Sequence, residues 1–278
     1  MSGQARPIHT IGRSGDLPRF FGLTYAITWA LHGAIALFEF DNLFEPGLPL
    51  LLYMLGLLGP MTAALILSHR QGGTGARTLL KQIFIVRFSP LWYLLAFGVI
   101  AAVNYLALVL NMASGGPTPE SWFALPLAFL PILALVQLWV VIGEETGWRG
   151  YALPRLQARY GSLGGSVILG LLWTAWHLPM FLMPGAPQYG SSPFVFAGFL
   201  LSWSVLCTLL YNRSGGSLLS VMLFHWAANM WAFAVPLTEG AQPIALALTL
   251  LVAVLAVPAL PRPLFGTASS RSGGGPGT

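Results

Sequence analysis

Two adjacent acids and an arginine follow a long apolar run in this sequence. The run covers residues 125–143, and Glu144, Glu145 and Arg149 come directly after it. An apolar run of this length is typical of a membrane-spanning helix. Ionisable side chains at a membrane are energetically costly, so they are functional candidates by default. This segment is therefore the first candidate for chemistry.

Two later apolar runs contain the other concentrated polar side chains. His177 lies four residues after Trp173, and Asn229 lies four residues after His225. A carboxylate can act as a general base on water, whereas imidazole and amide N–H groups can stabilise an oxyanion. A Glu pair, two His and an Asn therefore suggest a buried hydrolytic site.

The two adjacent acids must have different roles, because consecutive residues of a helix point about 100° apart. Glu145 lies four residues before Arg149. This is the favoured order for an ion pair on one helix, so we predict that Glu145 pairs with Arg149. Glu144 is then predicted to face inward. The alternative is that all three are interfacial side chains that only end a helix.

The His and Asn side chains also have a purely structural interpretation. His177, or the pair His225 and Asn229, could simply hydrogen-bond a neighbouring helix, each contact being worth about 1 kcal/mol or less. Three polar sites in separate spans favour one shared site, because each alone carries a desolvation cost that the others can offset.

Composition predicts a membrane protein. Hydrophobic residues make up 56% of the 278 residues and charged residues only 8%, which excludes a soluble globular domain. About eight apolar runs are long enough to cross the hydrocarbon core as helices. We therefore predict an all-α polytopic helix bundle with spans at residues 20–40, 48–68, 91–112, 125–143, 162–183, 193–211, 217–236 and 244–260.

Charge placement predicts the orientation of this bundle. With eight spans and the N-terminus inside, all 13 Lys and Arg residues fall on one side of the membrane, and five of the eight acids fall on the other. Because short cytoplasmic loops collect Lys and Arg, both termini are predicted to be cytoplasmic, in the plasma (inner) membrane. The basic excess indicates attraction to the inner leaflet and not nucleic-acid binding.

The chain is predicted to hold a single transmembrane helical domain, residues 20–261. A cytoplasmic tail, residues 1–19, precedes it and a disordered cytoplasmic tail, residues 262–278, follows it. The first tail contains three Arg and no apolar core, so no cleavable signal peptide is predicted. The single cysteine, Cys207, excludes an internal disulfide and a multi-cysteine metal site, and its apolar surroundings predict a buried, inert thiol.

The depth of the candidate residues poses a geometric question. At about 1.5 Å per residue, Glu144 would lie at the inner edge of the membrane, His225 roughly 15 Å in and His177 deeper still. Straight helices would not bring these side chains together. Kinks near Pro131 and Pro179, a span that begins below the membrane surface, or a conical cavity would reconcile the depths.

The motifs together resemble those of a known family. They are Glu144-Glu145-x-x-x-Arg149, an aromatic residue four before His177, and His225-x-x-x-Asn229, in this order. This set resembles the CAAX prenyl endopeptidase and bacteriocin-processing family (CPBP, or Abi) of intramembrane proteases. The resemblance covers residues 125–236, the predicted catalytic core. The second motif of that family usually opens with Phe, and here Trp173 keeps an aromatic side chain in that place.

The resemblance implies both an architecture and an activity. The implied architecture is an eight-helix bundle around a water-filled cavity that opens to the cytosol. The implied activity is cleavage of peptide bonds in membrane-associated or CAAX-type substrates, which are peptides or membrane proteins. The implied site is lined by Glu144, His177, His225 and Asn229 and supported by Glu145, Arg149 and Trp173.

Two hydrolytic mechanisms are open at this point. In one, Glu144 acts as general base on a water that His177 orients, while His225 and Asn229 donate to the oxyanion. In the other, His177 and His225 bind zinc, with Glu144 as third ligand or as base. The residue types fit either mechanism, so the need for a metal cofactor is left open.

Two functions other than proteolysis are open as well. A membrane transporter could use the same buried Glu and His side chains for ion coupling. The Gly-interrupted segments in matching halves that favour a transporter are missing from the sequence. A non-catalytic immunity or scaffold protein of the same fold could bind a partner peptide. Substrate identity and oligomeric state are not indicated by the residues.

Overall fold

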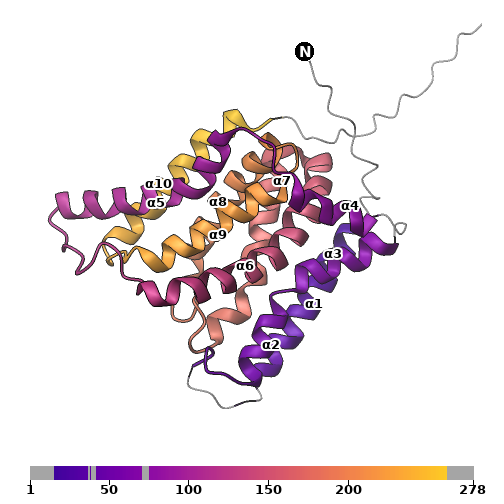
Figure 1. The fold of residues 1–278 in the computed structure, drawn as a ribbon, viewed down its shortest axis with the longest axis horizontal. Helices are drawn as coiled ribbons and strands as arrows, with labels where there is room; N and C mark the ends of the chain where they lie inside the picture. Colours follow the sequence, from indigo (N-terminus) through magenta and orange to yellow (C-terminus); the bar gives the residue numbers. More distant parts are fainter. Residues whose placement is uncertain (1–15, 37, 39–41, 71–74, 262–278) are drawn as a thin grey trace, which may run out of the picture.

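The computed structural model describes residues 16–36, 38, 42–70 and 75–261, and every regular element within them is helical (Figure 1). The predicted all-α helix bundle is therefore confirmed. Both predicted tails lie largely or wholly outside the described residues. The α-helices of the described part are α1 (Leu17–Ile35), α2 (Leu48–Gly56), α3 (Gly59–Arg70), α4 (Gly75–Lys81), α5 (Pro90–Ala113), α6 (Leu130–Gly147), α7 (Leu153–Trp176), α8 (Pro193–Arg213), α9 (Leu218–Ala234) and α10 (Ala241–Ala256).

Several of these helices are suited to a membrane. Four helical segments of the described chain are long and apolar enough to span one, and α2 and α3, bent by 48°, make a fifth if they are one broken span and not a re-entrant loop. The chain is thus an integral membrane protein. Helix α9 is apolar but has only 17 residues, and the α6–α7 region forms one helical segment, Leu127–Leu182. The predicted count of eight spans stays a prediction.

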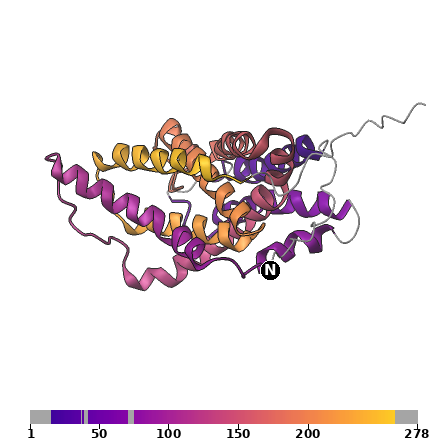
Figure 2. The same ribbon diagram turned by 90° about the horizontal axis from the view of Figure 1, so that it is seen from above.

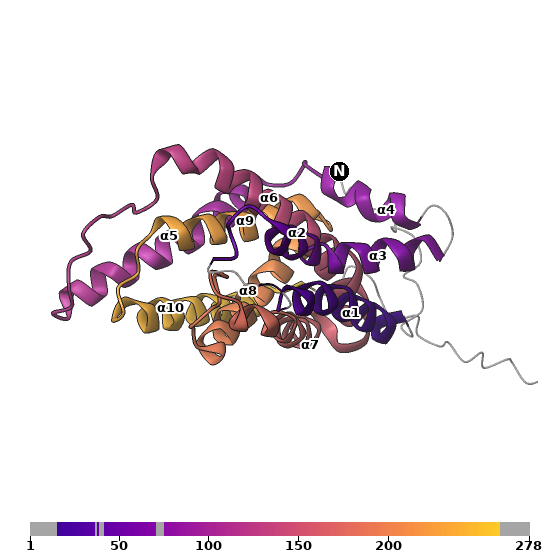
Figure 3. The same cartoon turned by 90° about the horizontal axis from the view of Figure 1, so that it is seen from below.

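The helices form two layers (Figures 2 and 3). One layer holds α1, α7, α8 and α10, and the other holds α3, α6, α9 and α5. Neighbours within the layers pack along their lengths, as α7 does on α8 and α6 on α9, and the layers join through α1 on α3 and α5 on α10. The motif-bearing helices α6 and α9 therefore face α7 across the interior of the bundle.

The segment between α6 and α7 is helical rather than an open polar connection. A π-helix, Trp148–Ala152, joins the two α-helices, and every residue from 143 to 157 is buried. The path turns within α7 at Gly161, whose φ of 73° favours glycine. Because the chain turns back at Gly161, the end of α7 returns to the end of α6, where Trp173 bonds to Glu144. This turn brings the first two motifs together without a kink at Pro131.

The three prolines expected to kink helices lie near the starts of helices. Pro131 lies in the first turn of α6, where its missing N–H costs nothing, so it begins the helix and does not kink it as expected. Pro179 lies in a 3-10 helix, Leu178–Leu182, that follows the end of α7 at Trp176. Pro60 lies at the start of α3, beside the bend between α2 and α3.

Two glycines let α6 pass close to α3. A Cβ added at Gly143 would come within 2.8 Å of the carbonyl oxygen of Leu57, and one added at Gly147 within 2.5 Å of Pro60. Small residues four apart allow such close helix crossings in membranes. The two glycines flank the acids, so this crossing fixes Glu144 and Glu145 deep within the bundle.

Candidate active site

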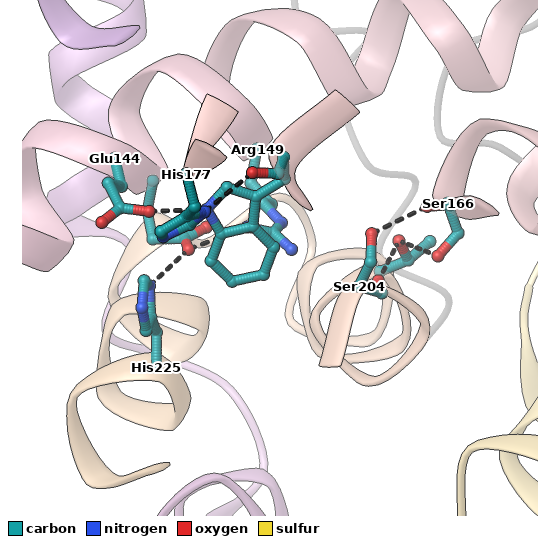
Figure 4. A network of polar contacts seen from close by, with 9 residues as sticks. Glu144, Arg149, Ser166, His177, Ser204 and His225 are labelled. Atoms are coloured by element: carbon teal, nitrogen blue, oxygen red, sulfur yellow. Dashed lines mark hydrogen bonds and ion pairs between the residues drawn. The ribbon is translucent and has the colours of Figure 1, made fainter. Parts of the chain in front are cut away.

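Glu144 is buried and held by an indole. Its side chain lies in a group with those of Arg149, His177 and His225 (Figure 4), and its residue exposure is 2%. Trp173 Nε1–H, from α7, donates to Glu144 Oε2 over 2.6 Å. No hydrogen bond to Oε1 is formed within the described chain. One carboxylate oxygen is thus anchored and the other is left for a further partner.

Glu145 points away from Glu144 and joins two basic groups. Arg149 Nη1 donates to Glu145 Oε1 over 2.9 Å, and His225 Nδ1 lies 2.8 Å from the same oxygen. The predicted Glu145–Arg149 ion pair is therefore present, and both side chains are fully buried. The interfacial interpretation of these acids does not fit their burial. The contact between Glu145 and His225 was not predicted.

Both motif histidines make their hydrogen bond through the same ring nitrogen, Nδ1. His177 Nδ1 lies 2.8 Å from the carbonyl oxygen of Trp173. A carbonyl only accepts, so His177 Nδ1 carries a proton, and Nε2 offers a lone pair when the ring is neutral. His225 Nδ1 faces the Glu145 carboxylate in the same way. The hydrogen bond at one nitrogen thus sets what the other can do.

Trp173 lies at the centre of these groups. Its ring centroid is 5.1 Å from that of His225 and 6.0 Å from that of His177. The guanidinium of Arg149 lies over the Trp173 ring, 4.3 Å from the centroid, a cation–π contact. A Phe here would keep the ring contacts, whereas only an indole can also donate to Glu144.

Asn229 is engaged by a residue that sequence analysis missed. Asn229 Nδ2 donates to Gln137 Oε1 of α6 over 2.8 Å. Gln137 is buried and lies seven residues, or two turns, before Glu144. A signal was available, because Gln137 is the only amide or charged side chain in the apolar run of residues 125–143.

The first two helices reach the site from outside the motifs. Trp176, which directly precedes His177, donates from its indole to Thr28 of α1 over 2.9 Å. The Trp176 carbonyl accepts from Trp29 over 3.1 Å. One turn after Thr28, His32 lies 3.2 Å from the carbonyl oxygen of Tyr53 in α2. Helix α1 thus fixes the end of α7 that carries His177, which nothing in the sequence of α1 indicated.

The structure therefore brings most of the predicted residues into one network. Trp173 is its hub, through its bond to Glu144 and its contacts with both His rings. Glu145, Arg149 and His225 form an ion-paired group on the same indole. Asn229 is one turn from His225 on α9, but its bond goes to Gln137 and not to this network.

The zinc alternative can be tested against this arrangement. Two Nε2 lone pairs are suitable zinc donors, and zinc in a catalytic site needs three protein ligands. The described residues contain no group of three or more His, Cys, Asp and Glu side chains placed to hold a metal ion. The single cysteine, Cys207, is buried as predicted and is free. The residue arrangement does not fit a zinc site.

Comparison with known proteins agrees with the motifs. Residues 126–231 match the model of the Rce1-like family, described as type II CAAX prenyl endopeptidase Rce1-like. The chain is also similar to CAAX prenyl protease 2 of Methanococcus maripaludis, with 24% identity over 246 residues, which are 84% of this chain and 90% of that protein. These matches agree with the resemblance of the motifs to the CAAX prenyl endopeptidase (CPBP) family of intramembrane proteases.

Proposed function

We propose that this protein is an intramembrane endopeptidase that hydrolyses a peptide bond of a CAAX-type substrate with a water activated by Glu144. The observation that carries the proposal is the buried Glu144 carboxylate, which is anchored through one oxygen by Trp173 and lies in one network with two histidines. The similarity to a protein named CAAX prenyl protease 2 supports the substrate class.

The first step is addition of water to the scissile carbonyl. Glu144 Oε1 accepts a proton from the water as the oxygen of the water bonds to the carbonyl carbon. His177 donates its Nδ1 proton to the Trp173 carbonyl, so its neutral ring presents a lone pair at Nε2 that can accept a hydrogen bond from the same water. Glu144 then returns the proton to the peptide nitrogen as the C–N bond breaks. The products are a new C-terminal carboxyl group and a free amine.

The charge that develops on the carbonyl oxygen needs donors. An N–H of Asn229 can supply one, and His225 Nε2 can supply another when the ring carries both protons. The Glu145 carboxylate, 2.8 Å from His225 Nδ1, provides the counter-charge for that form. Donors of this kind act on charge that is fully developed only in the transition state.

The surroundings of the site complete the proposal. The substrate is a peptide or membrane protein held in the bilayer, and no nucleic acid takes part. The protein lies in the plasma (inner) membrane with both termini in the cytosol, and the site faces the cytosol through a water-filled cavity. The one-sided placement of the Lys and Arg residues supports this orientation.

The test is an assay of purified protein in lipid nanodiscs with a fluorogenic, farnesylated CAAX-type peptide, read by mass spectrometry of the products. Wild type should cleave the peptide into two products. Glu144→Gln should fold but lose about 10² to 10⁴ in turnover, because the shape is kept and the base is lost. If Glu144→Gln hydrolyses the peptide as fast as wild type, the proposed mechanism is wrong. If wild type binds the peptide without cleaving it, the scaffold function is favoured instead.

A further inference from the structure

Three hydrogen bonds cross from α9 to α6 around the site. His225 Nδ1 bonds to Glu145, Asn229 Nδ2 bonds to Gln137, and the indole of Trp226 bonds to the carbonyl of Ala134. The bonds of His225 and Asn229 end on polar side chains of α6, and these are the two residues proposed to donate to the oxyanion. Gln137 lies within the matched segment, residues 126–231, but outside all three motifs.

The contact with Gln137 can decide which side of the Asn229 amide faces the substrate. A carboxamide has a donating NH₂ on one side and an accepting oxygen on the other, and a half-turn exchanges them. Gln137 Oε1 accepts one of the two Asn229 N–H groups over 2.8 Å. That bond favours the orientation in which the second N–H is free. Without an acceptor at this place, the accepting oxygen of Asn229 could face the substrate carbonyl and repel it.

The position of Gln137 on α6 also links it to the proposed catalytic groups. Gln137 and Glu144 are seven residues apart, so they lie on one face of α6, roughly 10 Å apart along its axis. Glu145, which anchors His225, is the next residue. One rigid helix therefore carries the proposed base and the anchors of both proposed oxyanion donors.

We propose that Gln137 is a positioning residue that orients the Asn229 amide as an oxyanion donor. This proposal rests on the proposed hydrolytic function. The competing explanation is that the bond between Gln137 and Asn229 only joins two helices, for which about 0.6 kcal/mol is an average contribution in membrane proteins. The two explanations differ in what they predict for turnover.

The test uses two substitutions that separate accepting from donating. Gln137→Leu removes the acceptor, and we expect turnover to fall about 10- to 100-fold with KM unchanged, part of the 10² to 10³ attributed to a whole oxyanion donor. Gln137→Glu keeps an accepting oxygen in either protonation state, and its turnover should stay within a few-fold of wild type. In the Asn229→Ala background, Gln137→Leu should have no further effect, because Gln137 acts through Asn229.

A matched control is available in a second buried amide pair. Gln157 of α7 and Asn212 of α8 exchange two hydrogen bonds, of 3.2 and 2.7 Å, away from the motifs. Gln157 also accepts from Ser162, so Gln157→Leu should lower thermal stability at least as much as Gln137→Leu but leave turnover unchanged. If Gln137→Leu does not fold, Gln137→Met, which is closer in shape, replaces it in every comparison.

Three outcomes overturn the proposal. In the first, Gln137→Leu has the turnover of wild type and lower stability, as for simple helix association. In the second, Gln137→Glu loses as much turnover as Gln137→Leu, which would make the Gln137 N–H itself a donor. In the third, the losses of Gln137→Leu and Asn229→Ala multiply, which would make them independent. Failure of wild type to hydrolyse the peptide would instead refute the proposed function.

Discussion

Glu145 joins a buried cation to a proposed catalytic histidine, and the two roles can be separated. Its Oε1 lies 2.9 Å from Arg149 Nη1 and 2.8 Å from His225 Nδ1, and neither Glu145 nor Arg149 is exposed. Removing one partner of a buried ion pair costs about 3–5 kcal/mol, because the remaining charge is unpaired. Glu145→Gln and Arg149→Met should therefore each lower the stability of the protein by about this amount.

The double variant Glu145→Gln/Arg149→Met removes both charges and should regain most of the lost stability, since a buried pair replaced as a whole is often close to neutral. Its turnover should still be low. The bond to His225 loses its ionic partner, and hydrogen bonds to charged groups are worth about 1.5–3 kcal/mol, or about 10- to 100-fold in rate. Arg149→Met alone keeps the carboxylate at His225 and should retain more turnover than the double variant.

The assay pairs thermal unfolding with turnover of the CAAX-type peptide in the same nanodisc preparation. Stability should be low in both single variants and restored in the double variant, whereas turnover should follow the presence of the Glu145 carboxylate. A double variant that regains wild-type turnover together with stability would refute this reasoning. Glu145 would then serve only Arg149, and its contact with His225 would have no part in the reaction.

Three further predictions follow from the site and the charge pattern. Trp173→Phe should fold but lose about 10- to 100-fold in turnover, because the indole N–H bond to the Glu144 carboxylate is lost while the ring contacts remain; unchanged kinetics would show that the bond is dispensable. Dialysis against a chelator should leave turnover unchanged and elemental analysis should find no stoichiometric metal, whereas a loss that zinc restores would establish a metal enzyme. Reporters fused after Arg155 and near Gly185 should be cytoplasmic and external, respectively, and an external Arg155 would refute the predicted orientation.

Local patterns in the sequence were enough to predict much of the site. The apolar runs indicated an all-α membrane bundle, and the residues with polar chemistry were recognisable because they interrupt these runs. The 100° offset separated Glu144 from Glu145, and the four-residue spacing correctly paired Glu145 with Arg149. Each of these inferences depends on neighbours within one or two turns of a single helix, where spacing alone sets the geometry.

What only the tertiary structure decided is which distant residues meet. The contact of Glu144 with Trp173 joins residues 29 apart, that of Glu145 with His225 joins residues 80 apart, and that of Gln137 with Asn229 joins residues 92 apart. These contacts depend on the turn at Gly161 within α7 and on the order in which the helices pack. Neither follows from helical periodicity, because a period gives the direction of a side chain around its own axis and not the neighbour that it will meet.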